Sequence, residues 1–388
     1  MAELTLEITG LTHDGRGVGR HEGRAVFVIG AVPGDVVRAR ESGRRRRLIE
    51  ACLVDVVRPS PDRATPFCPH YGHCGGCQLQ HLSPAAQRHW KQHNLRMNLA
   101  RHWNVEDIDW PAPVTGPDTG YRRRARFHGQ RNRGTALLGF RARSSHAIVD
   151  IDSCPLLEAP LNAAWQVRRE QLKDTLGRKP QQWTGVAADN GVFWSDEETE
   201  QRPFYTLDDL RLHFAPAGFI QANRHINEQM VHQALAWLAP RAGDQVLDLF
   251  CGIGNFSLPL ARRAGMVTGV EGVAQSVELA RFNADANGLK NTRFEIANLF
   301  EPPQNQRWSE APCDLVLLDP GRDGAEAVCR WLKPKPARRV VYVSCNPATF
   351  VRDSVHLRDN GWRLLRVQLL DMFQHTLHTE VMALFEPA

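Results

Sequence analysis

The stretch Gln245-Val-Leu-Asp-Leu-Phe-Cys-Gly-Ile-Gly-Asn255 decides the fold. Its first five residues form an apolar strand pattern that runs into a tight glycine turn, and residues 256–263 then follow a helical pattern. The alternation continues along the chain, with strands expected at 267–271, 315–319 and 340–344 and a helix at 274–287. Such alternation predicts a doubly wound α/β sheet, whose ligand lies at the carboxyl ends of the strands.

The turn and the strand after it have the residues of a nucleoside site. Glu271 follows Gly252 by about 20 residues, the offset at which an acid can hold ribose hydroxyls. A dinucleotide site would have a third glycine at position 257, where this chain has Ser257, so S-adenosylmethionine fits better than NAD. Asn298 stands where adenine is contacted after the third strand. Asp319 ends the fourth strand, where it can meet the methionine end or the substrate.

A thiol follows the next strand, in Ser344-Cys-Asn-Pro347, where a nucleophile would stand. Carbon-5 of a pyrimidine is a poor nucleophile. A thiolate that adds to C6 makes an enolate whose C5 can attack a methyl group, and a base must then remove the C5 proton before the cysteine leaves. The sequence therefore predicts Cys345 as a nucleophile and Glu380, at the start of the last strand, as the base.

Four cysteines have the pattern of a metal site. Cys68, Cys74 and Cys77 lie close together, and Cys154 stands alone before a proline. All-thiolate ligation suits either zinc or an iron–sulfur cluster. Zinc sites typically use two Cys-x-x-Cys pairs and this chain has one, so the spacing favours a [4Fe–4S] cluster. The Cys-x3-Cys-x2-Cys spacing of radical enzymes is absent, which predicts a structural cluster.

The N-terminal part is basic. The chain carries a formal net charge of +5, but residues 1–150 hold 23 Lys and Arg against 14 Asp and Glu, and the rest holds 25 against 29. Arginines gather at 44–47 and 122–126. Because Arg pairs with phosphate and stacks on bases, we expect a polyanion partner, with a solvated charged face as the alternative. Short strand patterns over 4–54 predict a small OB-like barrel, a fold that presents a sheet face to nucleic acid.

Composition sets the class of protein. The length of 388 residues is more than one core usually holds. Of these residues 42% are apolar and 23% are charged, a composition that excludes wholesale disorder. There is no apolar run long enough to cross a bilayer, and residues 1–7 lack the layout of a signal peptide. We expect a cytoplasmic protein of two or three domains that has no membrane partner.

Taken together, these segments resemble the RNA (uracil-C5)-methyltransferase family, in particular the bacterial branch that joins a TRAM domain to an iron–sulfur cluster and modifies 23S rRNA. The resemblance is carried by the cysteine spacing and by segments similar to TRAM turns and catalytic motifs: 13–19, 32–35, 218–223, 248–255 and 344–349. It implies three domains: a TRAM barrel at 1–58, a small β-rich iron–sulfur domain at 59–215 and a Rossmann-like methyltransferase domain at 216–388. A helix at about 84–104 is expected to pack on the catalytic domain.

The resemblance also implies roles for single residues. S-adenosylmethionine would be held by Gln221, Phe250, Asn255, Glu271, Asn298 and Asp319. Cys345 would be the nucleophile, Glu380 the base, and Cys68, Cys74, Cys77 and Cys154 the cluster ligands. Arg126 is expected to contact the RNA or the target base. The substrate would be a uridine of 23S rRNA in a loop, flipped out of its stack, and the protein is expected to act as a monomer.

Other interpretations stay open. A tRNA uracil-C5 methyltransferase would use the same chemistry, although that branch usually lacks the barrel and the cysteine quartet. A non-catalytic RNA-binding iron–sulfur protein would have no use for Cys345 or Glu380. A methylthiotransferase also combines TRAM with iron–sulfur chemistry but needs the radical spacing. Two positions depart from the family pattern: Gly321, where Pro or Ala is expected, and Gln374, where Phe-Pro is usual.

Overall fold

The computed structural model describes residues 3–45, 48–303, 306–334 and 337–388. The chain divides into two compact units. Unit 1 comprises Met1–Met97, Leu137–Ile151 and Phe373–Leu377, and unit 2 comprises Asn98–Ala136, Asp152–Met372 and His378–Ala388. The three-domain division expected above stays a prediction, because each unit gathers segments from distant parts of the chain.

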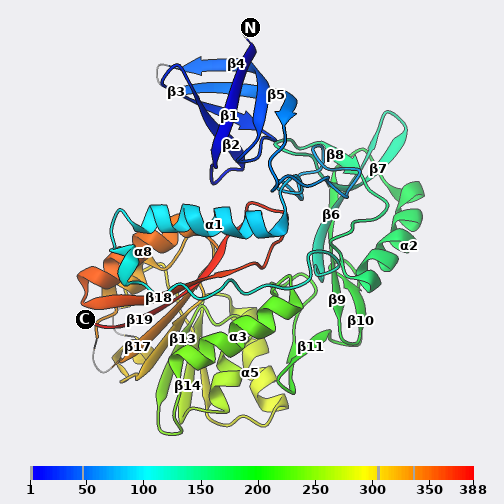
Figure 1. Cartoon of the computed structure of the whole chain (residues 1–388). Coiled ribbons are helices and arrows are strands. Elements are labelled where there is room, and N and C mark those ends of the chain that lie inside the picture. Colours follow the sequence, from blue (N-terminus) through cyan, green and yellow to red (C-terminus); the bar gives the residue numbers. More distant parts are fainter. Residues whose placement is uncertain (1–2, 46–47, 304–305, 335–336) are drawn as a thin grey trace. The chain divides into compact units, whose positions relative to one another are not determined.

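Unit 1 begins with a closed five-stranded barrel (Figure 1). Its order is β1-β2-β3-β5-β4, with β1 (Glu3–Leu11), β2 (Arg16–His21), β3 (Arg24–Ile29), β4 (Val36–Arg45) and β5 (Leu48–Arg58). Every second residue of β1 points inward, so that Leu4, Leu6 and Ile8 are buried. The expected OB-like barrel is confirmed. Of the arginine run, Arg44 and Arg45 end β4, whereas Arg46 and Arg47 lie outside the described residues.

The rest of unit 1 is the cysteine segment, most of helix α1 (Pro84–Leu99), and the antiparallel pair formed by β7 (Thr135–Arg141) and β8 (Ile148–Asp150). Helix α1 ends at Leu99, about five residues before the end expected near residue 104. A buried apolar cluster joins the barrel, the cysteine segment and α1, with Leu377 packed against it; its members are Leu11, Val32, Leu79, Leu82 and Ala86.

In unit 2, the range 155–215, in which the sequence shows no motif, is largely regular structure. Strands β10 (Gly191–Trp194), β9 (Gln181–Ala188) and β6 (Arg124–Asn132) pair in that order, antiparallel throughout. Helix α2 (Ala159–Thr175) covers them, and Trp165 stacks on Phe127 with the ring centroids 4.0 Å apart. A short 3-10 helix (Val105–Asp107) precedes this layer, and a hairpin of β11 (Phe204–Leu207) and β12 (Leu210–His213) follows it.

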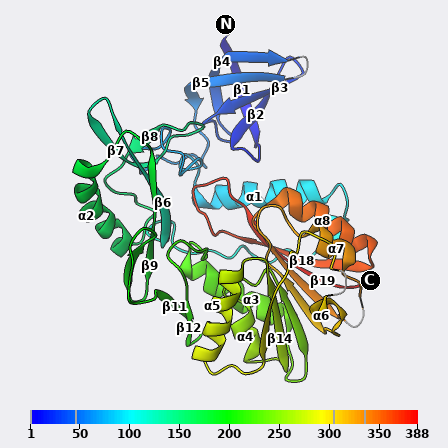
Figure 2. The ribbon, with the colours of Figure 1, turned by 180° about the vertical axis from the view of Figure 1, so that it is seen from behind.

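The core of unit 2 is a seven-stranded sheet with helices along it (Figure 2). Its order is β15-β14-β13-β16-β17-β19-β18, with β13 (Gln245–Leu249), β14 (Met266–Glu271), β15 (Thr292–Ile296), β16 (Leu315–Leu318), β17 (Arg339–Ser344), β18 (Trp362–Leu370) and β19 (Glu380–Pro387). The helices are α3 (Arg224–Leu238), α4 (Ser257–Ala261), α5 (Ala274–Ala286), α6 (Arg307–Glu310), α7 (Glu326–Trp331) and α8 (Pro347–Asp359).

The first five of these strands run parallel, and β19 is antiparallel to both of its neighbours. All four residues of β16 are buried, as expected for a parallel strand covered on both faces. The strand order reverses at β13, which lies between β14 and β16, and such a reversal is where doubly wound sheets bind ligands. The expected α/β class is confirmed.

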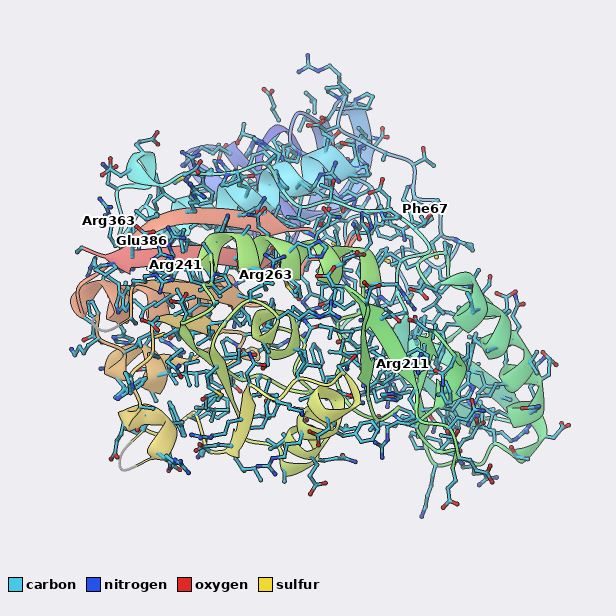
Figure 3. All side chains as sticks on the ribbon, turned by 90° about the horizontal axis from the view of Figure 1, so that it is seen from below. Phe67, Arg211, Arg241, Arg263, Arg363 and Glu386 are labelled. Carbon is cyan, nitrogen blue, oxygen red and sulfur yellow. The ribbon has the colours of Figure 1, made fainter. Side chains whose placement is uncertain are left out.

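The outside of unit 2 carries exposed cations, among them Arg211, Arg241, Arg263 and Arg363 (Figure 3). None of the helices in the described part of the chain combines the length and the apolar character that crossing a membrane requires.

Candidate active site

The glycine turn after β13 has a backbone that few residues adopt. Phe250, Gly252 and Gly254 have φ angles of 64°, 55° and 94°. A Cβ at position 254 would lie 2.3 Å from Leu258 Cδ1, so only glycine fits there. The Phe250 and Cys251 N–H groups donate to Val270 O at 2.9 and 3.1 Å, which fixes the turn at the carboxyl end of β14.

Glu271 closes this turn with its carboxylate. Its Oε2 accepts from the Gly252 N–H at 3.2 Å, and its Oε1 accepts from the Val273 N–H at 2.9 Å. A carboxylate has about four lone-pair sites, so room remains for ribose hydroxyls. Contact with the cofactor stays a prediction for Glu271, as it does for Phe250, whose ring centroid lies 5.8 Å from that of Phe300.

Asn298 is exposed, and its amide holds its own turn. Its Nδ2 donates to Glu301 Oε1 at 2.8 Å, and its Oδ1 accepts from the Phe300 N–H at 3.1 Å. The predicted contact with adenine therefore competes with these local bonds.

The Asn255 side chain is bound to two residues that sequence reasoning missed. Its Oδ1 accepts from the Tyr205 hydroxyl at 2.8 Å and from Asn227 Nδ2 at 3.0 Å, and its Nδ2 donates to Asn227 Oδ1 at 2.9 Å. The amide thus ties the glycine turn to α3 and β11. Since the partners lie 28 and 50 positions away along the chain, no local pattern could have revealed them.

Gln221 lies in a segment that Arg123 holds in place. Arg123 Nε donates to Gln221 O at 2.8 Å, and the Arg123 N–H donates to Ala222 O at 2.9 Å. The guanidinium is 0% exposed and sits 4.3 Å from the Tyr205 ring centroid, and burial lowers its pKa. The sequence counted Arg123 with the basic cluster expected to meet a polyanion. That expectation is wrong for this residue, because its side chain lies inside unit 2.

Cys345 occupies the turn between β17 and α8. Asn346 caps the helix by accepting from the Ala348 N–H at 3.1 Å, and its Nδ2 donates to Arg322 O at 2.9 Å. Pro347 begins the helix, where its missing N–H costs nothing. The partly buried Cys345 thiol is therefore fixed beside a helix N-terminus.

The sheet register brings Glu380 to Cys345. The last β17–β19 pair is Ser344 with Val381, so one further step of this antiparallel register sets Cys345 opposite Glu380. Asp319 follows β16, the parallel neighbour of β17. Burial first, and then the Glu380 and Asp319 carboxyls, raise the pKa of Cys345 to about 11, against the opposing charge of Arg322. The predicted nucleophile, the predicted base and Asp319 are thus close together.

A second buried acid lies beside Asp319. Burial and the Asp248 carboxyl raise the pKa of Asp319 to about 8, and burial raises that of Asp248 to about 7, although Ser257 Oγ donates to Asp248. Asp248 Oδ1 is buried and has no hydrogen-bond partner within the part of the chain described. With these pKa values Asp319 is mostly protonated and Asp248 about half protonated at neutral pH, and a cationic ligand would displace the protons. This environment suits a sulfonium or ammonium group.

The predicted metal ligands fall into both units. Cys68, Cys74 and Cys77 belong to unit 1 and Cys154 to unit 2. The Gly76 N–H donates to Cys74 Sγ at 3.4 Å, and hydrogen bonds to sulfur are among the features that tune iron–sulfur clusters. The donor set of thiols and this N–H···S bond fit the predicted cluster, whose presence stays a prediction.

Arg126, the predicted RNA contact, is exposed on β6. It lies near Arg124, whose pKa is lowered first by burial and then by the charge of Arg126. A cation that faces solvent is available to phosphate, and the role of Arg126 stays a prediction.

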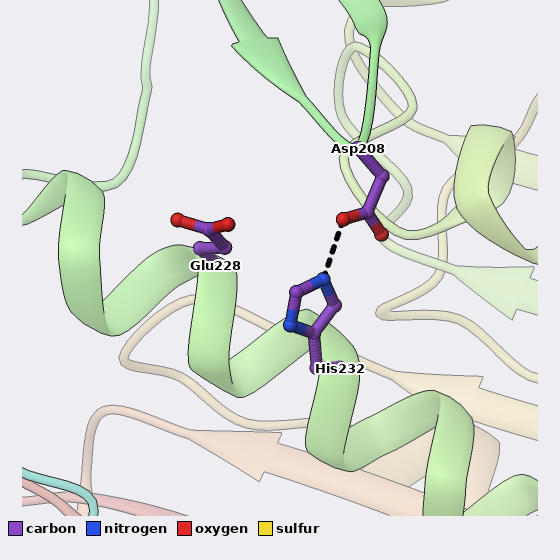
Figure 4. Close-up of side chains that lie close together, drawn as sticks. All are labelled: Asp208, Glu228 and His232. Carbon is purple, nitrogen blue, oxygen red and sulfur yellow. Dashed lines mark hydrogen bonds and ion pairs between the residues drawn. The ribbon is translucent and has the colours of Figure 1, made fainter.

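A separate cluster joins Asp208, Glu228 and His232 (Figure 4), whose candidate ligand atoms lie within 4.8 Å of one another. His232 Nε2 is 2.6 Å from Asp208 Oδ1, and Glu228 stands one helical turn before His232 on α3. Glu228 and His232 are exposed. The contact between His232 and Asp208 is a surface hydrogen bond between α3 and the β11–β12 hairpin, and it is sufficient to explain why these side chains lie together.

Comparison with known proteins identifies two family models in the chain. The model described as tRNA (Uracil-5-)-methyltransferase matches residues 156–387, and the TRAM domain model matches residues 2–40. The match to TRAM covers the first four strands of the barrel up to the middle of β4.

Curated relatives match nearly end to end. The chain is 42% identical to the 23S rRNA (uracil(1939)-C(5))-methyltransferase RlmD of Pseudomonas fluorescens, over 98% of this chain and 93% of that protein. It is 40% identical to the protein of the same name from Vibrio parahaemolyticus, over 98% and 95%. Among solved structures, the Pyrococcus abyssi tRNA (uracil-54, C5)-methyltransferase in complex with S-adenosyl-L-homocysteine has a TM-score of 0.77 at 24% identity, covering 98% of this chain and 100% of that one. That likeness shows a shared fold.

Proposed function

Because the chain belongs to the RNA (uracil-C5)-methyltransferase family, we propose that Cys345 and Glu380 carry out the methylation of a uridine at C5. The protein is an S-adenosylmethionine-dependent methyltransferase of 23S rRNA, and its relatives named for uridine 1939 make that position the proposed target. The observation that carries the proposal is the β17–β19 register, which sets the thiol beside the carboxyl.

The first proposed step forms a bond between Cys345 Sγ and C6 of the uracil. The thiol must lose its proton first, because the thiolate is the nucleophile. Burial and the carboxyls of Glu380 and Asp319 oppose this loss and raise the pKa of Cys345 to about 11. Arg322 and the N-terminus of α8 both favour the thiolate. The addition moves the electrons of the C5=C6 bond onto C5 and O4, which makes C5 nucleophilic.

When bound, S-adenosylmethionine would supply the methyl group that C5 attacks, and the bond between its sulfur and the methyl would break to leave S-adenosylhomocysteine. The residues proposed to hold it surround the carboxyl edge of β13–β16: Gln221, Phe250, Asn255, Glu271, Asn298 and Asp319. At neutral pH Asp319 is mostly protonated and Asp248 about half protonated in the protein alone, and both become anionic when a cation binds beside them. In this proposal Asn255 acts mainly by holding the glycine turn, since both ends of its amide are already bonded.

The last step needs a side chain opposite the thiol that acts as a base. Glu380 takes the proton from C5, the C5=C6 double bond forms again, and the thiolate of Cys345 leaves. Burial of Glu380 at the start of β19 keeps its carboxylate fixed and away from bulk water.

RNA binding is proposed to rest on the barrel and on exposed cations such as Arg126. Phosphate contacts of this kind depend strongly on salt. The proposed [4Fe–4S] cluster, bound by Cys68, Cys74, Cys77 and Cys154, would hold the cysteine segment in place. Anaerobically purified protein should contain iron and sulfide, and stoichiometric zinc instead would contradict the cluster.

The test uses RNA that carries 5-fluorouridine at the target, which has no C5 proton to lose. With S-adenosylmethionine, the wild-type protein should become covalently attached to this RNA. Cys345→Ala should form no adduct, and the matched control Cys313→Ala should behave as wild type. An adduct in Cys345→Ala would overturn the assignment of the nucleophile.

The base is tested with ordinary RNA. Glu380→Gln should transfer the methyl group and then stall, so that methylated RNA accumulates on the protein. Normal turnover of Glu380→Gln would remove Glu380 from the mechanism.

A further inference from the structure

We infer that Gln87 and Lys91 of α1 are positioning residues for Glu380, because they hold the segment Phe373–Leu377 that leads into it. The inference rests on the proposed function, in which Glu380 is the base. The segment lies in the connection between β18 and β19, shortly before Glu380 begins β19.

The division of the chain first points to this segment. Residues Asp152–Met372 and His378–Ala388 belong to unit 2, whereas the five residues Phe373–Leu377 belong to unit 1. Only His378 and Thr379 separate the segment from Glu380. Contacts of these five residues with α1, the cysteine segment and the barrel hold the segment, and in this inference the covalent chain carries that restraint to Glu380.

His375 is the centre of the attachment. Its carbonyl oxygen accepts from the Gln78 N–H at 2.9 Å and from the Leu79 N–H at 3.0 Å. Its own N–H donates to Gln87 Oε1 at 2.8 Å, and its ring Nδ1 lies 3.1 Å from Gln87 Nε2. His375 also has a φ of 64°, a conformation that costs energy for a residue with a side chain. The hydrogen bonds to Gln78, Leu79 and Gln87 stabilise this conformation of His375.

Gln87 connects three parts of unit 1 through one amide. Besides His375, its Nε2 donates to Leu79 O at 3.0 Å and to Leu82 O at 2.9 Å. The side chain is 1% exposed, so water cannot replace a lost bond at low cost. One turn along the same helix, Lys91 Nζ donates to Phe373 O at 3.2 Å and holds the other end of the segment.

An apolar contact completes the attachment. Leu377 packs on the cluster formed by the barrel, the cysteine segment and α1. The barrel turn lies against it as well, because a Cβ at Gly15 would be 2.7 Å from Leu377 Cδ2. Polar bonds at His375 and Phe373 and this apolar contact thus fix the segment at three points.

The two groups of the proposed mechanism are supported differently. Cys345 lies between β17 and α8, both of which belong to unit 2. Loosening Phe373–Leu377 should therefore leave the thiol in place while the carboxyl moves. A misplacement of about 1 Å can cost roughly a hundredfold in rate. The expected defect is confined to the removal of the C5 proton, after methyl transfer.

The experiment compares Gln87→Ala with Gln92→Ala, a partly exposed glutamine on the same helix that has no hydrogen bond to the segment among the described residues. With ordinary RNA, Gln87→Ala should lower kcat by about tenfold, the effect expected from losing a buried hydrogen bond. The KM for S-adenosylmethionine should not change. Methylated RNA should accumulate on the protein, less than in Glu380→Gln. Gln92→Ala should behave as wild type.

Gln87→Glu keeps the acceptor for the His375 N–H but sets a carboxylate oxygen against the Leu79 and Leu82 carbonyl oxygens, so it should not recover the rate. Hydrogen exchange at residues 373–379 should be faster in Gln87→Ala than in wild type. If Gln87→Ala does not fold, Lys91→Met removes the bond to Phe373 O and should show a several-fold form of the same defect.

The outcomes separate the two claims. If Glu380→Gln itself accumulates no adduct, the proposed base is wrong. If Glu380→Gln stalls as expected while folded Gln87→Ala and Lys91→Met turn over normally, the proposed function stands and this inference is overturned.

Discussion

Replacing Asp319 with asparagine should make the cofactor-free protein more stable at high pH and leave it unchanged in acid. Burial and the neighbouring Asp248 raise the pKa of Asp319 to about 8 from an ordinary value of 3.8. The folded state therefore keeps a proton that the unfolded chain releases above about pH 4. Between about pH 4 and pH 8 the folded state binds more protons, so the free energy of unfolding falls as pH rises through this window.

The size of the effect follows from the shift. A pKa shift of one is worth 1.36 kcal/mol, so a shift of roughly four gives an upper bound of about 5 kcal/mol on the change in the free energy of unfolding. Between pH 5 and pH 8, the part of the window that is convenient to measure, we expect a difference of about 3 kcal/mol between wild type and Asp319→Asn. Asp248 contributes to the shift at Asp319, so the substitution removes that repulsion as well.

Urea unfolding of the cofactor-free protein at a series of pH values provides the measurement. Wild type should lose stability steadily from pH 5 to pH 8, and Asp319→Asn should give a flatter curve. Asp323→Asn, an exposed acid in the same loop, is the matched control and should follow wild type. Parallel curves for wild type and Asp319→Asn would refute the electrostatic argument.

Three further predictions follow from single contacts. Tyr205→Phe removes the bond to Asn255 Oδ1 and should lower the free energy of unfolding by about 1 kcal/mol and weaken S-adenosylmethionine binding several-fold by calorimetry; unchanged affinity would show that Tyr205 does not orient the glycine turn. Asp35 is buried, and although burial opposes it, hydrogen bonds from Arg63, Ser60 and Val32 lower its pKa, so Asp35→Asn should cost about 2 to 4 kcal/mol near neutral pH. That deficit should shrink as pH falls below about 4, where wild type also loses the carboxylate, and a deficit independent of pH in urea unfolding would contradict the argument. Gly15→Ala places a methyl group 2.7 Å from Leu377 Cδ2 at a φ of 78°, and it should destabilise unit 1 by about 1 to 2 kcal/mol and speed hydrogen exchange at 373–379, while Gly23→Ala, with a similar φ but open space, should leave that exchange unchanged.

The sequence was sufficient for elements with a strong local pattern. The apolar strand at 245–249, the glycine turn after it and the thiol after the strand at 339–344 all stand where their patterns indicated. Strand β2 was harder to predict from the sequence, because Gly17 and Gly19 interrupt the alternation of apolar and polar residues. Gly19 is required by tertiary structure, since a Cβ there would lie 2.4 Å from Glu7 O on the neighbouring strand.

What the sequence could not supply was the set of contacts between distant segments. Arg123 looks like any member of a basic run, and its burial against Tyr205 depends on how β6 and β11 meet within unit 2. In the same way, nothing near His375 predicts a bond to Gln87, 288 positions earlier in the chain. Residues of this kind position the reacting groups, and local composition has no signal for them.

The charges around Cys345 explain why the parts of this site depend on one another. The thiol faces two carboxyls, and together with burial they keep its proton on at neutral pH in the protein alone. Asp319 is itself protonated there until a cation binds. A bound sulfonium therefore has two opposite consequences: it draws the proton from Asp319, and it offsets the added negative charge near the sulfur. In the proposed mechanism the thiolate of Cys345 is therefore favoured once the methyl donor is bound, whereas Glu380, whose carboxyl opposes the thiolate, acts only at the later removal of the C5 proton.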